Sequence, residues 1–208
     1  MALRIPPGRA GRIWLRSRLE IAARGAALLD RKRQVLLREQ QRLRAELRDA
    51  QLAWDAAAAE VEHWTARSAI LDGPGRLALL ARHVHGRAEL EVSWSNLMGA
   101  RLPAANGVVL PQAPPLSALG ASAAAVLLER ACRDATLAAA RCAVAQRAEA
   151  EVSAELARAV RRLRALEHRW IPQHEQALAQ LDLALDESQR EQAARVRWLT
   201  RRRDPAQA

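Results

Sequence analysis

The stretch LLREQQRLRAELRDAQLAWDAAAAEVEHW, residues 36–64, places an apolar side chain every three or four residues, with charged side chains between them. Alternating steps of four and three residues extend this seam back to Leu15 and forward to Trp64, and only Arg33 and Gln40 interrupt it with polar groups. A repeat of 3.5 residues over many heptads is typical of a coiled coil, since the apolar stripe of an isolated globular helix follows a period of 3.6. The pattern predicts one helix from about residue 12 to about residue 70.

A second seam of the same kind lies in the far half of the chain. It runs from Ala124 to Trp170, with Glu149 as its single polar position, and it is rich in alanine first and in leucine later. After Pro172 the apolar positions resume in a shifted register, at Leu178, Leu181 and Leu185. We therefore expect a second long helix that pairs with the first in antiparallel orientation.

The segment between the seams, residues 72–120, is the loop-rich part of the sequence. It holds five prolines and six glycines. Leu90, Val92 and Trp94 alternate with polar residues, which predicts a half-buried strand, and Asn106-Gly107 before the apolar residues 108–110 predicts a turn. This segment is expected to form a small cap, with a β-hairpin as one form that it could take.

These patterns together predict an all-α fold, a long antiparallel two-helix coiled-coil hairpin with a small irregular or β-containing cap in the middle of the chain. The expected parts are a first helix in residues 1–71, the cap in 72–120 and a second helix in 121–208, kinked near Pro172. A proline inside a helix leaves the carbonyl of His168 without its donor and costs about 3 kcal/mol or more, so a bend at this position is expected.

The charge pattern favours solvated helix faces. The formal net charge of +10 is compatible with nucleic acid or an anionic surface as a partner, but acidic residues are interleaved with the arginines. Several oppositely charged pairs have helical salt-bridge spacing: Glu20 with Arg24, Glu129 with Arg133, Asp186 with Arg190, and Glu191 with Arg195. No recognisable nucleic-acid-binding module is present.

Catalytic patterns are sparse. His83 and His85 have a spacing that could hold a metal from a strand, but no third ligand of suitable type lies nearby, so we predict no metal site. Phosphate-binding loops and nucleophile elbows are missing, and we predict a chain without catalytic residues or cofactors. Cys132 and Cys142 are expected to be small buried hydrophobic residues in a reducing compartment, and no stretch of signal-peptide or transmembrane type is found.

Three stretches resemble the D subunit of V-type and A-type rotary ATPases. They are LEIAARGAALLDRKRQVLL (residues 19–37), VSWSNLMGARLP (92–103) and RRLRALEHRWIP (161–172), the last followed by Leu185, Asp186, Glu187 and Arg190. The middle stretch matches through Val92 and the cap residues Asn96, Met98, Gly99 and Pro103. The three lie in the family's order and cover nearly the whole chain.

The resemblance implies a central rotor axle that couples ATP turnover to ion movement. The implied partners are the A and B subunits of the catalytic hexamer, the F subunit, and the C subunit (d in eukaryotes) above the membrane ring, with a cytoplasmic location at the membrane through the complex. Since both termini converge at one end, Arg9, Arg12, Arg201, Arg202 and Arg203 are the candidate contacts with the hexamer, although the last three also fit a solvated helix end. A structural coiled-coil scaffold and a basic coiled coil associated with nucleic acid remain alternatives.

Overall fold

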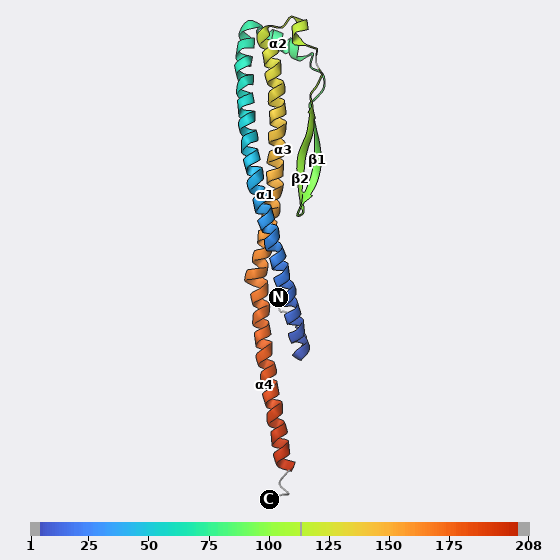
Figure 1. The fold of residues 1–208 in the computed structure, drawn as a ribbon, viewed down its shortest axis with the longest axis vertical. Coiled ribbons are helices and arrows are strands. Elements are labelled where there is room, and N and C mark those ends of the chain that lie inside the picture. The colour runs from blue at the N-terminus through green and yellow to red at the C-terminus, as the bar shows by residue number, and fades with distance from the viewer. Residues whose placement is uncertain (1–4, 113, 204–208) are drawn as a thin grey trace. The chain divides into compact units, whose positions relative to one another are not determined.

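The computed structural model describes residues 5–112 and 114–203, with the side chains of 201–203 excepted (Figure 1). The elements in chain order are α1 (Gly8–Leu71), α2 (Pro74–Ala81), β1 (Glu89–Leu97), β2 (Ala100–Val109), η1 (Leu116–Leu119), α3 (Ala123–Ala165), the π-helix η2 (Leu166–Trp170) and α4 (Ile171–Arg203). The chain divides into two compact units, one made of residues 1–33 and 158–208 and the other of residues 34–157.

Burial follows the two predicted seams closely. Every position of the first seam is buried or half-buried except Trp54, which is 43% exposed. Every position of the second seam, from Ala124 to Trp170, is buried or half-buried. The predicted fold class is confirmed, with long helices and a small two-stranded antiparallel sheet between them.

In the unit of residues 34–157, α1 and α3 lie antiparallel and enclose two apolar clusters. One cluster contains Leu36, Leu43, Ala100, Ala148 and Val152, so the start of β2 packs into the same layer as the two helices. The other joins Leu80 of α2, Leu116 of η1 and Ala125 of α3 where the helices are connected. The tip of the β-hairpin is therefore packed against α1 and α3, and the second cluster packs the segments that connect them.

The connection between α1 and α3 is held by one carboxylate. The Asp72 side chain, only 5% exposed, accepts hydrogen bonds from the Ser122 backbone N–H at 3.2 Å and from the Ser122 hydroxyl. Ser122 Oγ in turn accepts the N–H of Ala125 at 3.2 Å, as a helix N-cap does. Arg76 donates to the carbonyl of Gly120 at 2.5 Å and lies 3.9 Å from Asp72. Residues 50 positions apart are thus tied together.

The strand prediction was correct in place but wrong in two details. The predicted Asn106-Gly107 turn lies inside β2, where Glu91 pairs with Gly107 and Val92 with Ala105, so that Asn106 is the extra residue of a β-bulge. Leu90 and Trp94, predicted on the buried face of the strand, are exposed, at 39% and 50%. The reason is that β2, through Ala100, Leu102 and Pro103, supplies the side chains that pack inward.

The other unit pairs the first part of α1 with the end of α3, η2 and α4. Its buried side chains are Leu15, Ala22, Ala26, Ala159, Leu163 and His174. Arg12 and Arg16 of α1 reach Asp182 of α4 at 3.9 and 3.8 Å, and the two helices run antiparallel here (Figure 1). Within the described range, no helix combines the length and the apolar character that a membrane span requires.

The π-helix η2 lies directly before Pro172 and accounts for the shifted seam. The N–H of Ile171 donates to the carbonyl of Leu166, five residues earlier, so the turn holds one residue more than an α-turn. Beyond it His174 is buried and Gln173 exposed, whereas regular steps from Leu166 through Trp170 would place residue 173 in the seam. The sequence predicts a kink near Pro172, and the structure places a one-residue insertion in the helix directly before that residue.

Candidate functional site

The candidate contact residues at the start of α1, Arg9 and Arg12, differ in their exposure and in their ion pairs. Arg9 is exposed, whereas Arg12 lies half-buried beside Asp182. Asp182 is shared with Arg16, so one carboxylate faces two guanidinium groups. Arg12 and Arg16 thus form long ion pairs with α4, while Arg9 forms no ion pair within the described part of the chain.

The candidates at the other end are only partly described. Helix α4 extends to Arg203, but the side chains of Arg201, Arg202 and Arg203 lie outside the described residues.

The last part of α4 presents exposed apolar side chains outside the predicted contact residues. All residues from 191 to 200 are exposed, including Val196 at 60% and Leu199 at 55%. On α1, Ile13, Ile21 and Leu28 are also more than half exposed, and the last two stand one heptad apart. The sequence signal was present, because an apolar seam that continues past its partner helix must be exposed or covered by another chain.

The cap residues Asn96, Met98, Gly99 and Pro103 shape the tip of the hairpin. Met98 and Gly99 have φ of 52° and 88°, the left-handed pair of a two-residue hairpin turn. The Asn96 side-chain oxygen accepts the Gly99 N–H at 2.9 Å, and Pro103 is buried opposite Trp94. The motif is therefore a turn signature, in which the half-exposed Met98 is the unusual member because left-handed φ favours Gly or Asn.

Met98→Gly is expected to stabilise the hairpin by about 0.5–1 kcal/mol, because glycine adopts the required φ without strain. Urea unfolding of the isolated chain measures this change. Asn96→Ala, which removes the oxygen that holds Gly99, is the comparison and should destabilise the chain. A destabilised Met98→Gly variant would mean that the Met98 side chain makes a stabilising contact.

A polar cluster links the two helices near the hairpin tip. Gln40 donates to Ser153 Oγ at 2.6 Å, Ser153 donates to Glu149 at 2.7 Å, and Arg44 Nε donates to Glu149 at 3.0 Å. These bonds, first that from Ser153, hold the pKa of Glu149 below its ordinary value. We call these four residues the polar lock.

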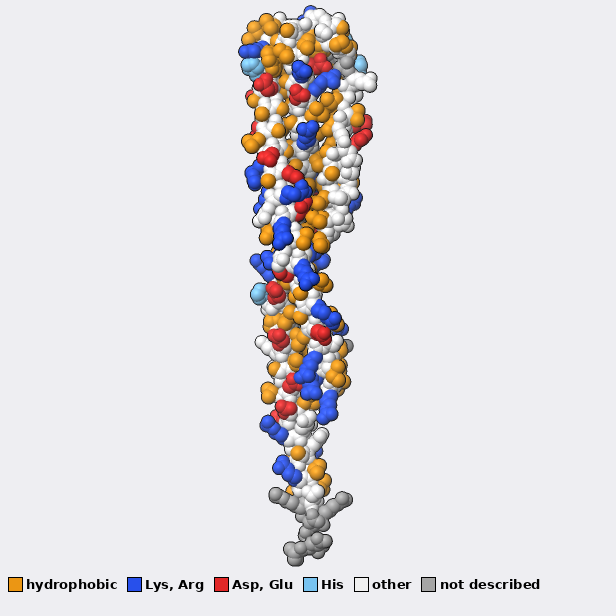
Figure 2. Space-filling view, viewed as in Figure 1, with side chains coloured by type: hydrophobic (Ala, Val, Ile, Leu, Met, Phe, Trp, Pro, Cys, Tyr) orange, Lys and Arg blue, Asp and Glu red, His pale blue; other side chains and the backbone are white. Residues whose placement is uncertain are grey.

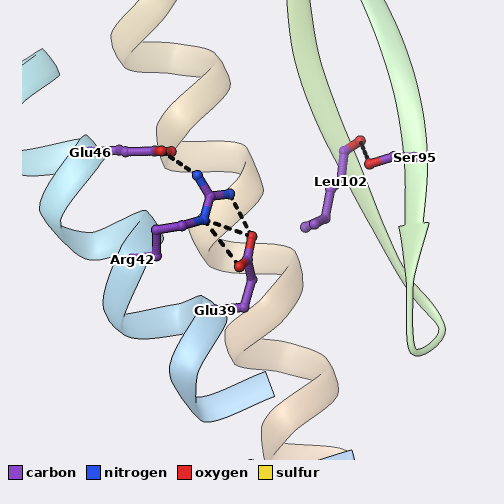
Figure 3. Close-up of polar contacts among 5 residues, drawn as sticks. All are labelled: Glu39, Arg42, Glu46, Ser95 and Leu102. Atoms are coloured by element: carbon purple, nitrogen blue, oxygen red, sulfur yellow. Dashed lines mark hydrogen bonds and ion pairs between the residues drawn. The ribbon is translucent and has the colours of Figure 1, made fainter. Parts of the chain in front are cut away.

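On the side of α1 that faces the β-hairpin, Arg42 bridges two carboxylates that lie seven residues, or about two helical turns, apart. Its Nη2 lies 2.5 Å from Glu39, and its Nη1 also bonds Glu46 (Figure 3). The hydrogen bond from Arg42 lowers the pKa of Glu39, and the bond to Glu39 raises the pKa of Arg42. Across from this bridge, Leu102 of β2 points toward the helices, while its carbonyl accepts the Ser95 hydroxyl at 3.5 Å.

His83 and the two cysteines lie in different surroundings. His83 Nδ1 donates to the carbonyl of Leu79 at 3.1 Å, and among the described residues no group of three or more His, Cys, Asp or Glu side chains could hold a metal ion. Cys142 is buried as expected, but the expectation for Cys132 was wrong, because it is exposed. Partial burial beside Glu129 raises the pKa of the Cys132 thiol.

Opposite charges alternate over the visible surface and form no single-sign stripe on the described part of it (Figure 2). Three of the predicted ion pairs form between described residues: Glu20 with Arg24 at 3.7 Å, Glu129 with Arg133 at 3.0 Å, and Glu191 with Arg195 at 3.8 Å.

Comparison with known proteins assigns the family. The sequence matches the family model for the D subunit of ATP synthase over residues 12–201. The chain belongs to the family of ATP synthase D subunits. It is 28% identical over 193 residues to the D subunit of the V-type ATP synthase of Thermus thermophilus, an alignment that covers 93% of this chain and 86% of that protein. The corresponding protein of a second Thermus thermophilus strain gives the same values.

Membership of the D-subunit family covers both units and all three stretches that carried the resemblance. In the structure, the middle stretch is the hairpin turn and the last one forms the end of α3 and the π-helix. Two of the three stretches thus include positions where the backbone departs from a regular helix or strand, whereas the first lies within the regular helix α1.

Proposed function

We propose that this chain is the central-stalk rotor subunit of a V/A-type rotary ATPase. As a non-catalytic subunit, it couples ATP turnover in the A and B subunits to rotation and ion translocation. Family membership supports this proposal, and the observation that carries it is the end of α4, where residues 191–200 are exposed and the apolar side chains of Val196 and Leu199 are 60% and 55% exposed. A helix with exposed apolar side chains fits a position where other subunits surround it.

In this proposal, the parts of the chain near the two termini and the cap bind different partners. The end that carries Arg9, Arg12, Arg201, Arg202 and Arg203 contacts the A and B subunits, together with Val196 and Leu199 of α4. The cap and its neighbouring helices contact the F subunit and the C subunit above the membrane ring. The chain is then cytoplasmic and attached to the cell membrane through the complex.

The π-helix and Pro172 have a mechanical role in this proposal. They lie between the tightly paired part of α3 and the segment of α4 that enters the hexamer. A one-residue insertion gives the helix a local change of direction and winding at this boundary.

Affinity purification from gently extracted membranes tests the proposal. The tagged chain should recover the A, B, F and C subunits. Recovery of nucleic acid or of cytoskeletal proteins in their place would contradict the rotor assignment.

A variant of the α4 end makes the purification specific. Val196→Asp combined with Leu199→Asp should reduce recovery of A and B by at least about tenfold, equivalent to about 1.4 kcal/mol, because it places unpaired carboxylates in the interface. Recovery of the F and C subunits should persist. Gln189→Asp combined with Gln192→Asp, also on exposed positions of α4, is the matched control and should have little effect.

A further inference from the structure

The polar lock lies inside an otherwise apolar seam. Gln40 is only 7% exposed, and the apolar side chains of Leu36 and Val152 on one side and of Leu43 and Ala148 on the other enclose it. A buried amide without a hydrogen-bond partner costs several kcal/mol in an apolar environment, so this position is favourable only when its acceptor is in place.

In the polar lock, the hydrogen bonds between the helices are donated by α1 and accepted by α3. Helix α1 supplies the donors, Gln40 and Arg44, and α3 supplies the acceptor Glu149, with Ser153 relaying the hydrogen bond between them. Glu149 has 19% of its side chain exposed, which leaves its charge partly shielded from water and dependent on Arg44. Each member therefore needs the others at the same height along the two helices.

The neighbouring seam discriminates poorly between registers. In α3 it consists of Ala131, Ala135, Ala138, Cys142 and Ala145, small side chains of nearly equal size. After a slip of one heptad in this antiparallel pair, Gln40 would face Val160 in one direction, and Glu149 would face Leu37 in the other. In both slipped registers a polar group of the lock meets an apolar side chain.

The two ends of this seam are held by different contacts. Asp72 and Ser122 fix the end where α1 and α3 are connected, and the alanine-rich seam separates them from the lock. The hairpin tip lies at the lock end, where Ala100 is 1% exposed and packs with Leu36, Leu43, Ala148 and Val152. The tip of the β-hairpin can pack in this way only if α1 and α3 are aligned so that these four side chains lie together.

We propose that the polar lock of Gln40, Arg44, Glu149 and Ser153 is a register-determining device, which aligns α1 with α3 so that the hairpin tip has one defined seat. A single polar position that specifies alignment in a coiled coil lowers stability and raises uniqueness. This inference concerns the isolated chain and does not depend on the rotor function.

Distance measurement between two spin labels tests the proposal. The labels are placed by Arg38→Cys and Arg141→Cys, both on exposed positions, in a chain with Cys132→Ser and Cys142→Ala. The parent should give a single narrow distance. The variant Gln40→Leu, Glu149→Leu, Ser153→Ala should give an additional population displaced by about 10 Å, the length of seven helical residues.

The outcome that overturns the proposal is a single distance in the triple variant, unchanged from the parent. Gln41→Leu with Gln146→Leu, on exposed positions outside the seam, is the matched control and should keep one distance. If circular dichroism shows that the triple variant does not fold, Glu149→Gln with Ser153→Ala is measured in its place with the same two outcomes.

Discussion

Asp72→Ala is expected to lower the free energy of unfolding by about 3 kcal/mol, because hydrogen bonds to a charged acceptor contribute about 1.5–3 kcal/mol and this carboxylate accepts two of them from Ser122. The Asp72 side chain is 5% exposed, so in the Asp72→Ala variant water cannot fully replace the carboxylate as the hydrogen-bond acceptor for Ser122. The loss also removes the partner that orients the N-cap of α3.

Urea unfolding monitored by circular dichroism measures this effect. Asp55→Ala, at an exposed position of α1, is the control and should change the stability by less than about 0.5 kcal/mol. Ser122→Ala should produce part of the Asp72→Ala loss, and the double variant should show less than the sum, because both residues belong to one network. Additive effects would show that Asp72 acts independently of Ser122.

Removal of the π-helix is expected to stabilise the isolated chain by up to about 3 kcal/mol, the usual cost of a proline inside a helix. The change combines deletion of Arg169, which is exposed, with Pro172→Ala. After the deletion, the seam residues Leu163, Leu166, Ile171, His174, Leu178, Leu181 and Leu185 follow unbroken steps of three and four residues. The helix can then continue without an extra residue while its buried face is kept.

Deletion of Gln176 is the matched control for this variant. It also removes one exposed residue, but it lies beyond the π-helix, so it rotates Leu178, Leu181 and Leu185 out of the seam and should destabilise the chain. Thermal unfolding compares the two deletions. A loss of stability in the Arg169 variant would show that the π-helix is required for packing.

The same variant tests the mechanical role of the π-helix. In the assembled complex, we expect ATP hydrolysis to continue with a reduced ratio of ions moved to ATP hydrolysed. Pro172→Ala alone keeps the extra residue and should change this ratio less. Unchanged coupling in both variants would contradict a mechanical role, while the rotor assignment itself would stand.

The coiled coil could be predicted from the sequence because apolar periodicity is a local property of each helix. The same alternating steps identified Gln40 and Glu149 as polar interruptions, and the structure places them in one network through Ser153. Their contact could not be predicted, since it depends on the register between segments about a hundred residues apart.

The hairpin was predicted only in part because its turn is encoded by an unusual residue. Asn106-Gly107 is the strongest short turn signal in the segment, yet the turn forms at Met98-Gly99. There the hydrogen bond from the Gly99 N–H to the Asn96 side chain stabilises the turn, although Met98 is an unfavourable residue type for it. The family resemblance included Asn96, Met98 and Gly99, but it did not say what they do. The exposed Trp94, which lies beside Arg101, also depends on which strand faces the helices.

The sequence shows the π-helix only as a register shift, which Pro172 alone could also explain. The step from Leu166 to Ile171 in the seam is five residues, which is one more than the longer of the two regular steps. A proline and an inserted residue are separate causes of irregularity, and only the backbone hydrogen bond from Ile171 to Leu166 distinguishes them.

Observation of rotation tests the rotor assignment most directly. A complex of the A and B subunits with this chain is immobilised through the hexamer, and a bead is attached to Leu79→Cys, an exposed position on α2, in a chain with Cys132→Ser. With ATP present, the bead should turn in one direction in steps, and it should stop when ATP is replaced by a non-hydrolysable analogue. A bead that stays fixed relative to the hexamer while ATP is hydrolysed would contradict the assignment of this chain as the rotor.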